Sequence, residues 1–159
     1  MIRETGRYAA HGPEAEFELG SRGRVLRNLV GIRSVREMAE RESTALLSTT
    51  QRLIDETHLD QRFTADDICR MHRLWLGEIY AWAGRYRSVN ITKSEFTFAA
   101  AGQVPRLMHE LETGPLREFT PCRSGENEEH ALAMATVHAE LILIHPSRVT
   151  AAAHACLQC

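Results

Sequence analysis

The sequence is short of lysine, of aromatic residues and of long apolar runs. Lys93 is the only lysine among the 19 basic residues, and the other 18 are arginines. With a formal net charge of −2, the chain lacks the global basic field of a nucleic-acid-binding protein, so we expect no nucleic-acid partner. The longest apolar stretch, residues 131–144, is interrupted by His138 and Glu140 and is too short to span a bilayer, so we expect no membrane partner.

Cysteine is also scarce, and its placement does not suggest a disulfide framework. The four cysteines are scattered, and no secretory signal stands at the N-terminus. Both features predict free thiols in a reducing, cytoplasmic location. Cys156 and Cys159 have C-x-x-C spacing, but they follow no strand and lack two further zinc ligands, which favours two incidental cysteines.

The residues that are present have the composition of one globular domain. Of 159 residues, 43% are hydrophobic and 25% are charged, which is typical of a chain that folds around a single core in water. Glycine and proline recur through the first thirty residues and argue against a long element there. We therefore predict an extended N-terminal arm over residues 1–33 and a domain over residues 34–159.

Two helices with clear N-terminal caps are predicted after the arm. Ser34 and Thr64 are each followed three residues later by an acidic residue, which is the spacing of a capping box. Apolar residues then recur at helical spacing in both segments. We expect the first helix to run to about Thr57, and the apolar stripe of the second to end at Gly84.

The remaining chain predicts a hairpin and two further helices. Apolar residues alternate within 90–98, which indicates two short extended pieces joined near Lys93 and Ser94. Pro105 suits the first turn of a third helix, which Gly114–Pro115 should break. The last helix, 127–144, is apolar on all sides, which predicts burial at the centre of a bundle. The expected fold is therefore mainly α-helical with a small β-hairpin.

Eight histidines raise the question of a metal site. His138 and His145 are seven residues apart and share a helical face, but there is no H-E-x-x-H motif and no compact ligand set, so we predict no metal site. His145 ends the apolar helix, and Pro146 turns the chain directly after it. A histidine held by a rigid element beside a cleft suits a general base, so His145 is the candidate catalytic residue.

The segment from about Thr64 to Pro146 resembles the Fic (Fic/Doc, or Fido) family. The motifs that carry the resemblance occur in order: Tyr80-Ala-Trp-Ala-Gly84-Arg-Tyr-Arg87, Val89-Asn-Ile91, Phe96, Val104-Pro-Arg-Leu-Met108, His138 and Ile144-His145-Pro146. The arm segments Pro13–Phe17 and Gly20–Leu26 are similar to the N-terminal part of bacterial Fic proteins. The resemblance implies an α-helical fold, a Fido core over about residues 64–159, and transfer of AMP from ATP to a hydroxyl of a target protein.

The family signature, H-x-F-x-[D/E]-G-N-G-R-x-x-R, implies a task for each part. The histidine, here His145, takes the proton from the attacking Ser, Thr or Tyr hydroxyl. The acidic residue holds Mg²⁺, and the G-N-G turn and the arginines bind the phosphates of ATP. Upstream, a hairpin flap positions the target by strand-like pairing, and Asn90 to Phe98 match it. The implied flap residues are Asn90, Ile91, Thr92, Lys93 and Phe96. Near the tip Lys93 could touch target or nucleotide, and a solvated turn lysine is an equally good interpretation.

This chain keeps the histidine and departs from the rest of the signature. After Pro146 it reads Ser147-Arg148-Val149-Thr150-Ala151, with Ser147 in the position of the phenylalanine and no acidic residue or glycine following. Losing one oxyanion-type donor typically costs about 10²–10³ in rate. Here the metal ligand, the phosphate turn and the arginines are all missing. We therefore expect no productive Mg²⁺ or ATP binding and no ordinary AMP transfer by this polypeptide.

The tail from Val149 to Cys159 fits translation one base out of register. Written GTA-ACG-GCC-GCN after a G, the codons of residues 149–152 give GGT-AAC-GGC-CGC in the neighbouring frame, which encodes Gly-Asn-Gly-Arg. Continuing to Gln158 permits x-x-Arg-Leu-Leu-Ala, and the GC-rich codons agree with the arginine excess. We therefore predict a frameshift near Ser147 and a Fic domain without its C-terminal helices.

Two classes of function remain open. The first is an enzyme of AMP-transferase ancestry that acts on protein hydroxyls. The second is a non-catalytic helical binding module, or the product of a frameshifted pseudogene. Partners could be an antitoxin, because no clean [S/T]-x-x-x-E-[G/N] inhibitory motif is present, or a second copy that covers apolar residues such as Leu141 and Ile142.

Overall fold

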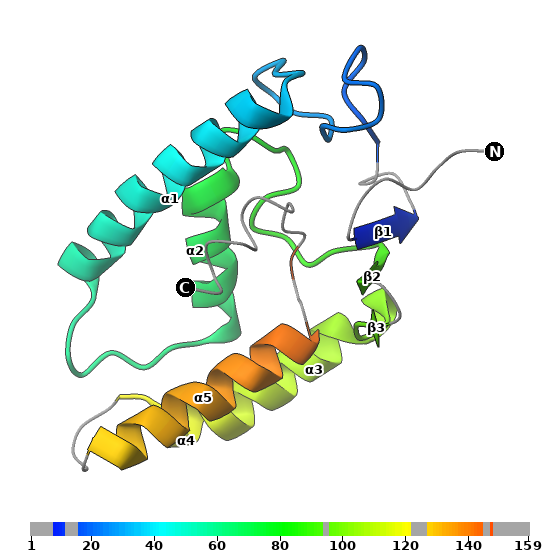
Figure 1. The fold of residues 1–159 in the computed structure, drawn as a ribbon. Coiled ribbons are helices and arrows are strands. Elements are labelled where there is room, and N and C mark those ends of the chain that lie inside the picture. Colours follow the sequence, from blue (N-terminus) through cyan, green and yellow to red (C-terminus); the bar gives the residue numbers. More distant parts are fainter. Residues whose placement is uncertain (1–7, 12–15, 94–95, 122–126, 145–146, 148–159) are drawn as a thin grey trace.

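The computed structural model describes residues 8–11, 16–93, 96–121, 127–144 and 147, and within these the chain is mainly helical with a small antiparallel sheet (Figure 1). The strands are β1 (Tyr8–His11), β2 (Asn90–Lys93) and β3 (Phe96–Thr97), and the helices are α1 (Val35–Glu56), α2 (Ala65–Leu76), the 3₁₀ turn η2 (Ala101–Gln103), α3 (Val104–Leu111), the π-helical turn η3 (Glu112–Leu116), α4 (Arg117–Phe119) and α5 (Asn127–Ile144). The predicted fold class is confirmed. None of the described helices has the length and apolarity needed to cross a membrane.

Both predicted helix starts are confirmed. The Ser34 hydroxyl accepts the backbone N–H of Glu37 at 3.4 Å at the start of α1. At the start of α2 the capping box is complete: Thr64 Oγ1 accepts the Asp67 N–H at 3.2 Å, and the Asp67 carboxylate accepts the Thr64 N–H at 2.9 Å. These bonds satisfy N–H groups that the helix itself leaves unpaired.

The second helix is shorter than its apolar stripe predicts. It ends at Leu76, and the chain then folds back over it in a series of turns as far as Gly84. Gly84 has φ +77°, and a Cβ there would lie 2.6 Å from the Cβ of Arg73, so the close approach requires glycine. Ile79 and Trp82 continue the stripe from these turns, because both still reach the core that α2 shares.

Three apolar clusters hold the described elements together. The first joins the arm, α1, α2 and the turns after it, with these buried members: Val25, Met38, Trp75, Leu76, Ile79, Tyr80 and Ala83. The second joins the start of α2 to α3, η3 and α5: Ala65, Val104, Met108, Leu111, Leu116 and Ile144. The third is the small group Val89, Ile91 and Phe98 under the hairpin. The arm is therefore packed on the domain through Val25, and Leu29 N–H donates to Ile79 O at 2.8 Å.

The predicted helix break at Gly114–Pro115 is wrong. The backbone passes through this pair as the π-helical turn η3 and continues into α4. A π turn is wider than an α turn, so it accommodates a proline that lacks the N–H and would clash in a regular α-helix.

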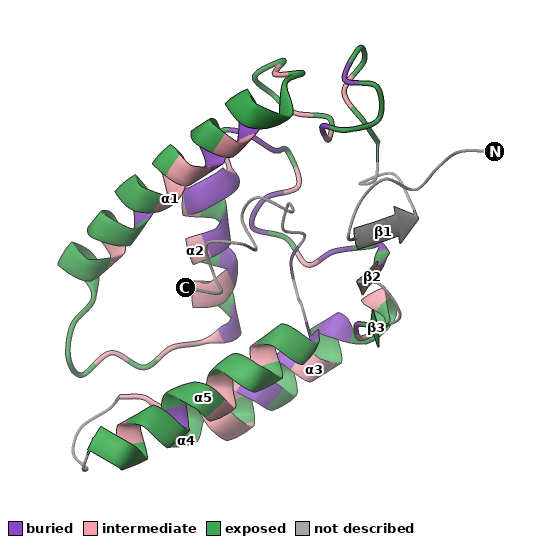
Figure 2. Ribbon diagram, viewed as in Figure 1, coloured by how far each residue is buried: buried purple, intermediate pink, exposed green. Residues whose placement is uncertain are grey.

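The predicted burial of the last helix is also wrong. Only Ala133 and Ile144 are buried in α5, whereas Leu132 is 70%, Met134 68% and Leu143 52% exposed. Figure 2 shows α5 largely exposed along its length, with its inner side against α3. Among the described elements, α3 and η3 supply packing partners on one side of α5, which covers one face of an all-round apolar helix.

Candidate active site at the flap and the end of α5

The predicted hairpin flap is present. β2 and β3 pair antiparallel with Lys93 opposite Phe96, and the Phe98 N–H donates to Ile91 O at 3.2 Å just beyond the ladder. The predicted joint at Ser94 lies outside the described residues. The flap is thus a tight two-stranded element rising from the small apolar cluster at its base.

The predicted flap residues differ in what they present to the surface. Ile91 is buried under the flap, whereas Phe96 is about half exposed. The Phe96 ring packs edge to face on the Phe98 ring, with 5.0 Å between the ring centroids. Asn90 is exposed, and its Oδ1 accepts the Ala101 N–H at 2.9 Å, which ties the start of β2 to η2. Thr92 is half-buried. Lys93 belongs to β2, but its side chain lies outside the described part, so its role stays a prediction.

His145 and Pro146 also lie outside the described residues, and the described residues on either side are Ile144 and Ser147. Ile144 ends α5 and is buried, and Ser147 is buried with 6% of its surface exposed. The Ala99 N–H, directly after the flap, donates to Leu143 O at 3.4 Å. The chain therefore leaves α5 beside the base of the flap.

Arg87 fastens these two elements together. Its side chain is 2% exposed, and its guanidinium donates to Val89 O at 2.8 Å, to Ile144 O at 3.1 Å and to Ala99 O. The Ile144 carbonyl belongs to the last turn of α5, where the helix dipole favours a cation. Arg87 belongs to the motif Tyr80–Arg87 that carries the family resemblance, and the sequence alone does not indicate this role. The signal in the sequence is an arginine three residues before β2, separated from it by Ser88 and Val89.

The buried titratable pair near the second cluster is not suited to acid–base chemistry at neutral pH. Burial, together with the neighbouring Cys69, raises the pKa of Tyr86 to about 12. Burial likewise raises the pKa of the Cys69 thiol, so the thiolate that reacts as a nucleophile is disfavoured. Both groups are structural members of this interface.

The residues present do not fit a Mg²⁺–nucleotide. Within the described ranges no three His, Cys, Asp or Glu side chains come together as metal ligands. The described groups around the end of α5 include the Arg87 guanidinium, the carbonyls that it binds and the Ser147 hydroxyl. The stretch 147–151 contributes no carboxylate and no glycine. Hard Mg²⁺ needs anionic oxygen ligands, so we derive no chemical step through the metal.

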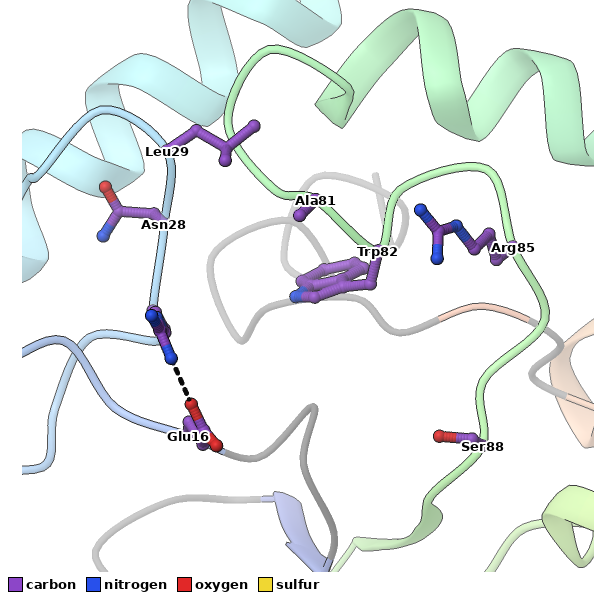
Figure 3. A pocket seen from close by; sticks show the side chains of 8 residues that line it. Glu16, Asn28, Leu29, Ala81, Trp82, Arg85 and Ser88 are labelled. Carbon is purple, nitrogen blue, oxygen red and sulfur yellow. Dashed lines mark hydrogen bonds and ion pairs between the residues drawn. The ribbon is translucent and has the colours of Figure 1, made fainter.

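A separate hollow of about 510 Å³ lies between the arm and the turns after α2 (Figure 3). The Trp82 indole lies at its centre, with Arg85 on one side and the Glu16–Arg27 ion pair on the other. Among the described residues that line it, none belongs to the flap. This hollow is therefore distinct from the candidate site.

Known proteins share both this sequence pattern and this fold. The Fic/DOC family pattern matches residues 62–148. The protein adenylyltransferase VbhT of Bartonella schoenbuchensis is 27% identical over 124 residues, which cover 78% of this chain and 26% of VbhT.

Solved Fic structures superpose on most of the chain. The N-terminal Fic domain of a Bartonella effector protein from Bartonella sp. AR 15-3 matches with a TM-score of 0.66 at 18% identity, over 78% of this chain and 61% of the other. BepC of Bartonella tribocorum, solved with AMPPNP, matches with a TM-score of 0.65 at 21% identity, over 78% of this chain and 65% of the BepC chain. The chain thus spans about a quarter of VbhT and less than two thirds of these solved chains. Since the family pattern covers more than half of its residues, the chain belongs to the Fic/DOC family.

Proposed function

We propose that this domain descends from an enzyme that transfers AMP from ATP to a hydroxyl of a target protein, with His145 as the general base and Asn90 to Phe98 as the target-binding flap. The observation that carries the proposal is the link through Arg87, which joins the carbonyls of Ala99 and Ile144. This link supports the proposal, because it holds Ile144, the residue before His145, at the base of the flap. The relative VbhT is a protein adenylyltransferase, and BepC was solved with an ATP analogue, in line with this chemistry.

We further propose that the polypeptide as it stands does not catalyse the transfer. General-base help alone contributes about 10²–10⁴ in rate, and the larger electrostatic share requires the metal ligand and the phosphate-binding turn. The family pattern matches up to residue 148, one position before the segment whose shifted codons permit Gly-Asn-Gly-Arg. This agreement supports a change of reading frame between Ser147 and Val149.

A labelled-ATP experiment tests the proposal. The chain, a restored variant and the same restored variant carrying His145→Ala are each incubated with Mg²⁺, ATP labelled at the α-phosphate, and a bacterial lysate. In the restored variant four bases are added at the codons of Ser147 and Arg148, so that three codons, for Phe-x-Asp, separate Pro146 from the shifted Gly-Asn-Gly-Arg. We expect label on protein with the frame-restored variant alone. Equal labelling by the unrestored chain would overturn the proposed inactivity. Equal labelling with and without His145 would overturn its role as the base, and no labelling by either restored variant would overturn the AMP-transferase ancestry.

The gene itself tests the frameshift. The shifted codons after Pro146 should spell Gly-Asn-Gly-Arg. Any other spelling would end this part of the proposal and leave the tail as a native sequence.

The second candidate function is a non-catalytic binding module, and the exposed face of α5 favours it. Leu132, Met134 and Leu143 leave apolar surface open that a second copy or an antitoxin-like helix could cover. Light scattering over a range of concentrations tests self-association. Leu143→Ser should lower the apparent mass, whereas Leu47→Ser at an exposed position of α1 should not. A monomer at every concentration would exclude the second copy as the occupant.

A further inference from the structure

The outer edge of β2 is occupied by the chain's own N-terminal segment. β2 is the central strand of the sheet, with β3 on one side and β1 on the other. β1 pairs antiparallel with it, with Ala9 opposite Thr92 and His11 opposite Asn90. Figure 1 shows β1 lying alongside the flap. An edge of this kind is where an extended peptide adds to a sheet.

The register shows which backbone groups of β2 face this edge. Successive residues of a strand direct their N–H and C=O groups to opposite sides. Ile91 O faces β3, because it accepts from Phe98 N–H at 3.2 Å. The N–H and C=O groups of Asn90 and Thr92 therefore face β1. Asn90 lies opposite His11, and Thr92 lies opposite Ala9. Ala10, one residue along, directs its N–H away from β2.

β1 has the properties of a replaceable occupant. It is four residues long, and two of the four are alanine, which is a poor strand former. The Phe17–Leu26 bridge anchors the arm shortly after β1, which keeps its effective concentration at the edge in the millimolar range. A longer extended segment would offer the same backbone bonds together with side-chain contacts.

We propose that the outer edge of β2 is a docking site for an extended segment of a partner protein, and that β1 holds this site in the free chain and must be displaced by the partner. The inference rests on the proposed function, which assigns the flap to target binding. It adds that the arm regulates access to the flap. Docking here needs backbone pairing alone, so it requires neither ATP nor the missing part of the signature.

Proline substitutions provide a matched pair of variants. Ala9→Pro removes an N–H that faces β2, whereas Ala10→Pro removes one that faces outward, as an edge strand tolerates. The probe is the capped synthetic peptide with the sequence of residues 6–12, titrated to millimolar concentration into ¹⁵N-labelled full-length protein. The readout is the movement of the Asn90 and Thr92 amide signals, with signals of α1 reporting that the fold is intact.

If β1 fills the edge about nine-tenths of the time, the peptide should bind Ala9→Pro about tenfold more tightly than the unchanged chain. Ala10→Pro should bind the peptide like the unchanged chain, and a peptide that carries proline in place of Ala9 should bind none of the three proteins. Equal affinity for all three proteins, or equal binding of the proline peptide, would overturn the proposal.

A second measurement uses the unchanged chain, so it does not depend on how the variants fold. Saturating peptide should move the Ala9 and His11 amide signals of the protein to their unpaired positions, in proportion to the movement at Thr92. Binding that leaves β1 paired would overturn the proposal. The titration contains no nucleotide, so a failure of AMP transfer leaves its expected result unchanged, and its own failure leaves the labelled-ATP experiment valid.

Discussion

Replacing Arg87 with methionine should loosen the flap from the end of α5. The substitution keeps most of the apolar volume and removes every hydrogen bond of the guanidinium to the carbonyls of Val89, Ala99 and Ile144. Val89 and Ile144 are buried, so water reaches their carbonyls poorly once the guanidinium is gone, whereas Ala99 is half-buried.

The expected cost follows from these two buried acceptors. A buried acceptor left without a partner costs about 1–3 kcal/mol, so the pair predicts a loss of about 3 kcal/mol in the free energy of unfolding. Removing a buried charge offsets part of this, and losing a cation at the C-terminus of α5 adds about 0.5 kcal/mol. Arg87→Lys keeps the charge but cannot reproduce the planar fork, so we expect it to restore about half of the loss.

Urea unfolding gives the global cost, and amide hydrogen exchange shows where it falls. For Arg87→Met we expect faster exchange at Phe98 and Ala99, whose N–H groups bond Ile91 and Leu143. The exchange rates of the α1 amides should change only as far as the global free energy of unfolding changes. Arg85→Met, two residues away at an exposed position, is the control and should change neither. An even loss of protection over α1 and the flap would show that Arg87 stabilises the core generally, and a cost below about 1 kcal/mol would refute the hydrogen-bond reasoning.

Three further predictions concern local features of the fold. Thr64→Ala should cost about 1 kcal/mol in urea unfolding and Ser34→Ala less, because the Ser34 bond is the longer one; equal costs would contradict this. Gly84→Ala should cost at least about 2 kcal/mol, since it combines φ +77° with a 2.6 Å clash, whereas Gly102→Ala, with nothing within 4 Å, should stay within about 0.5 kcal/mol. Since burial raises the pKa of Tyr86 from 10.0 to about 12, its contribution to stability is complete below pH 10 and lost as the pH rises to about 12. The free energy of unfolding should therefore fall between pH 10 and about 12, and this fall should be smaller in Tyr86→Phe. An equal fall in both proteins would contradict the prediction.

The features that the sequence predicted correctly are those determined by neighbouring residues. The caps at Ser34 and Thr64 depend on a partner three residues away, and the flap depends on alternation within nine residues. The end of α2 depends on contacts across the fold, because Gly84 must approach Arg73 closely for the turns to fold back. An apolar stripe marks which residues reach the core, and it does so equally from a helix and from the turns after it.

In the candidate site, too, the local features were predictable and the long-range ones were not. The flap was predictable from its own residues, whereas its occupation by β1 joins segments about eighty residues apart through backbone pairing, which leaves no periodic pattern in a four-residue segment. The role of Arg87 is likewise long-range. Its acceptors at Val89 and Ala99 are close in sequence, but the one at Ile144 is 57 positions away and becomes a partner only once α5 lies against α3.

The last helix shows why apolar composition alone misled the prediction of burial. Apolarity on all sides measures how much free energy covering the helix would yield, about 25 cal/mol for each Å² removed from water, and it does not say which segment supplies the cover. The described neighbours meet α5 on one side, so Ala133 and Ile144 are buried while Leu132 and Leu143 remain exposed. The exposed face is observed in the packing, whereas the out-of-frame codons after Arg148 are a prediction that the gene sequence tests. Both would have one explanation if, in proteins with the full Fic signature, the residues after the signature histidine cover this face.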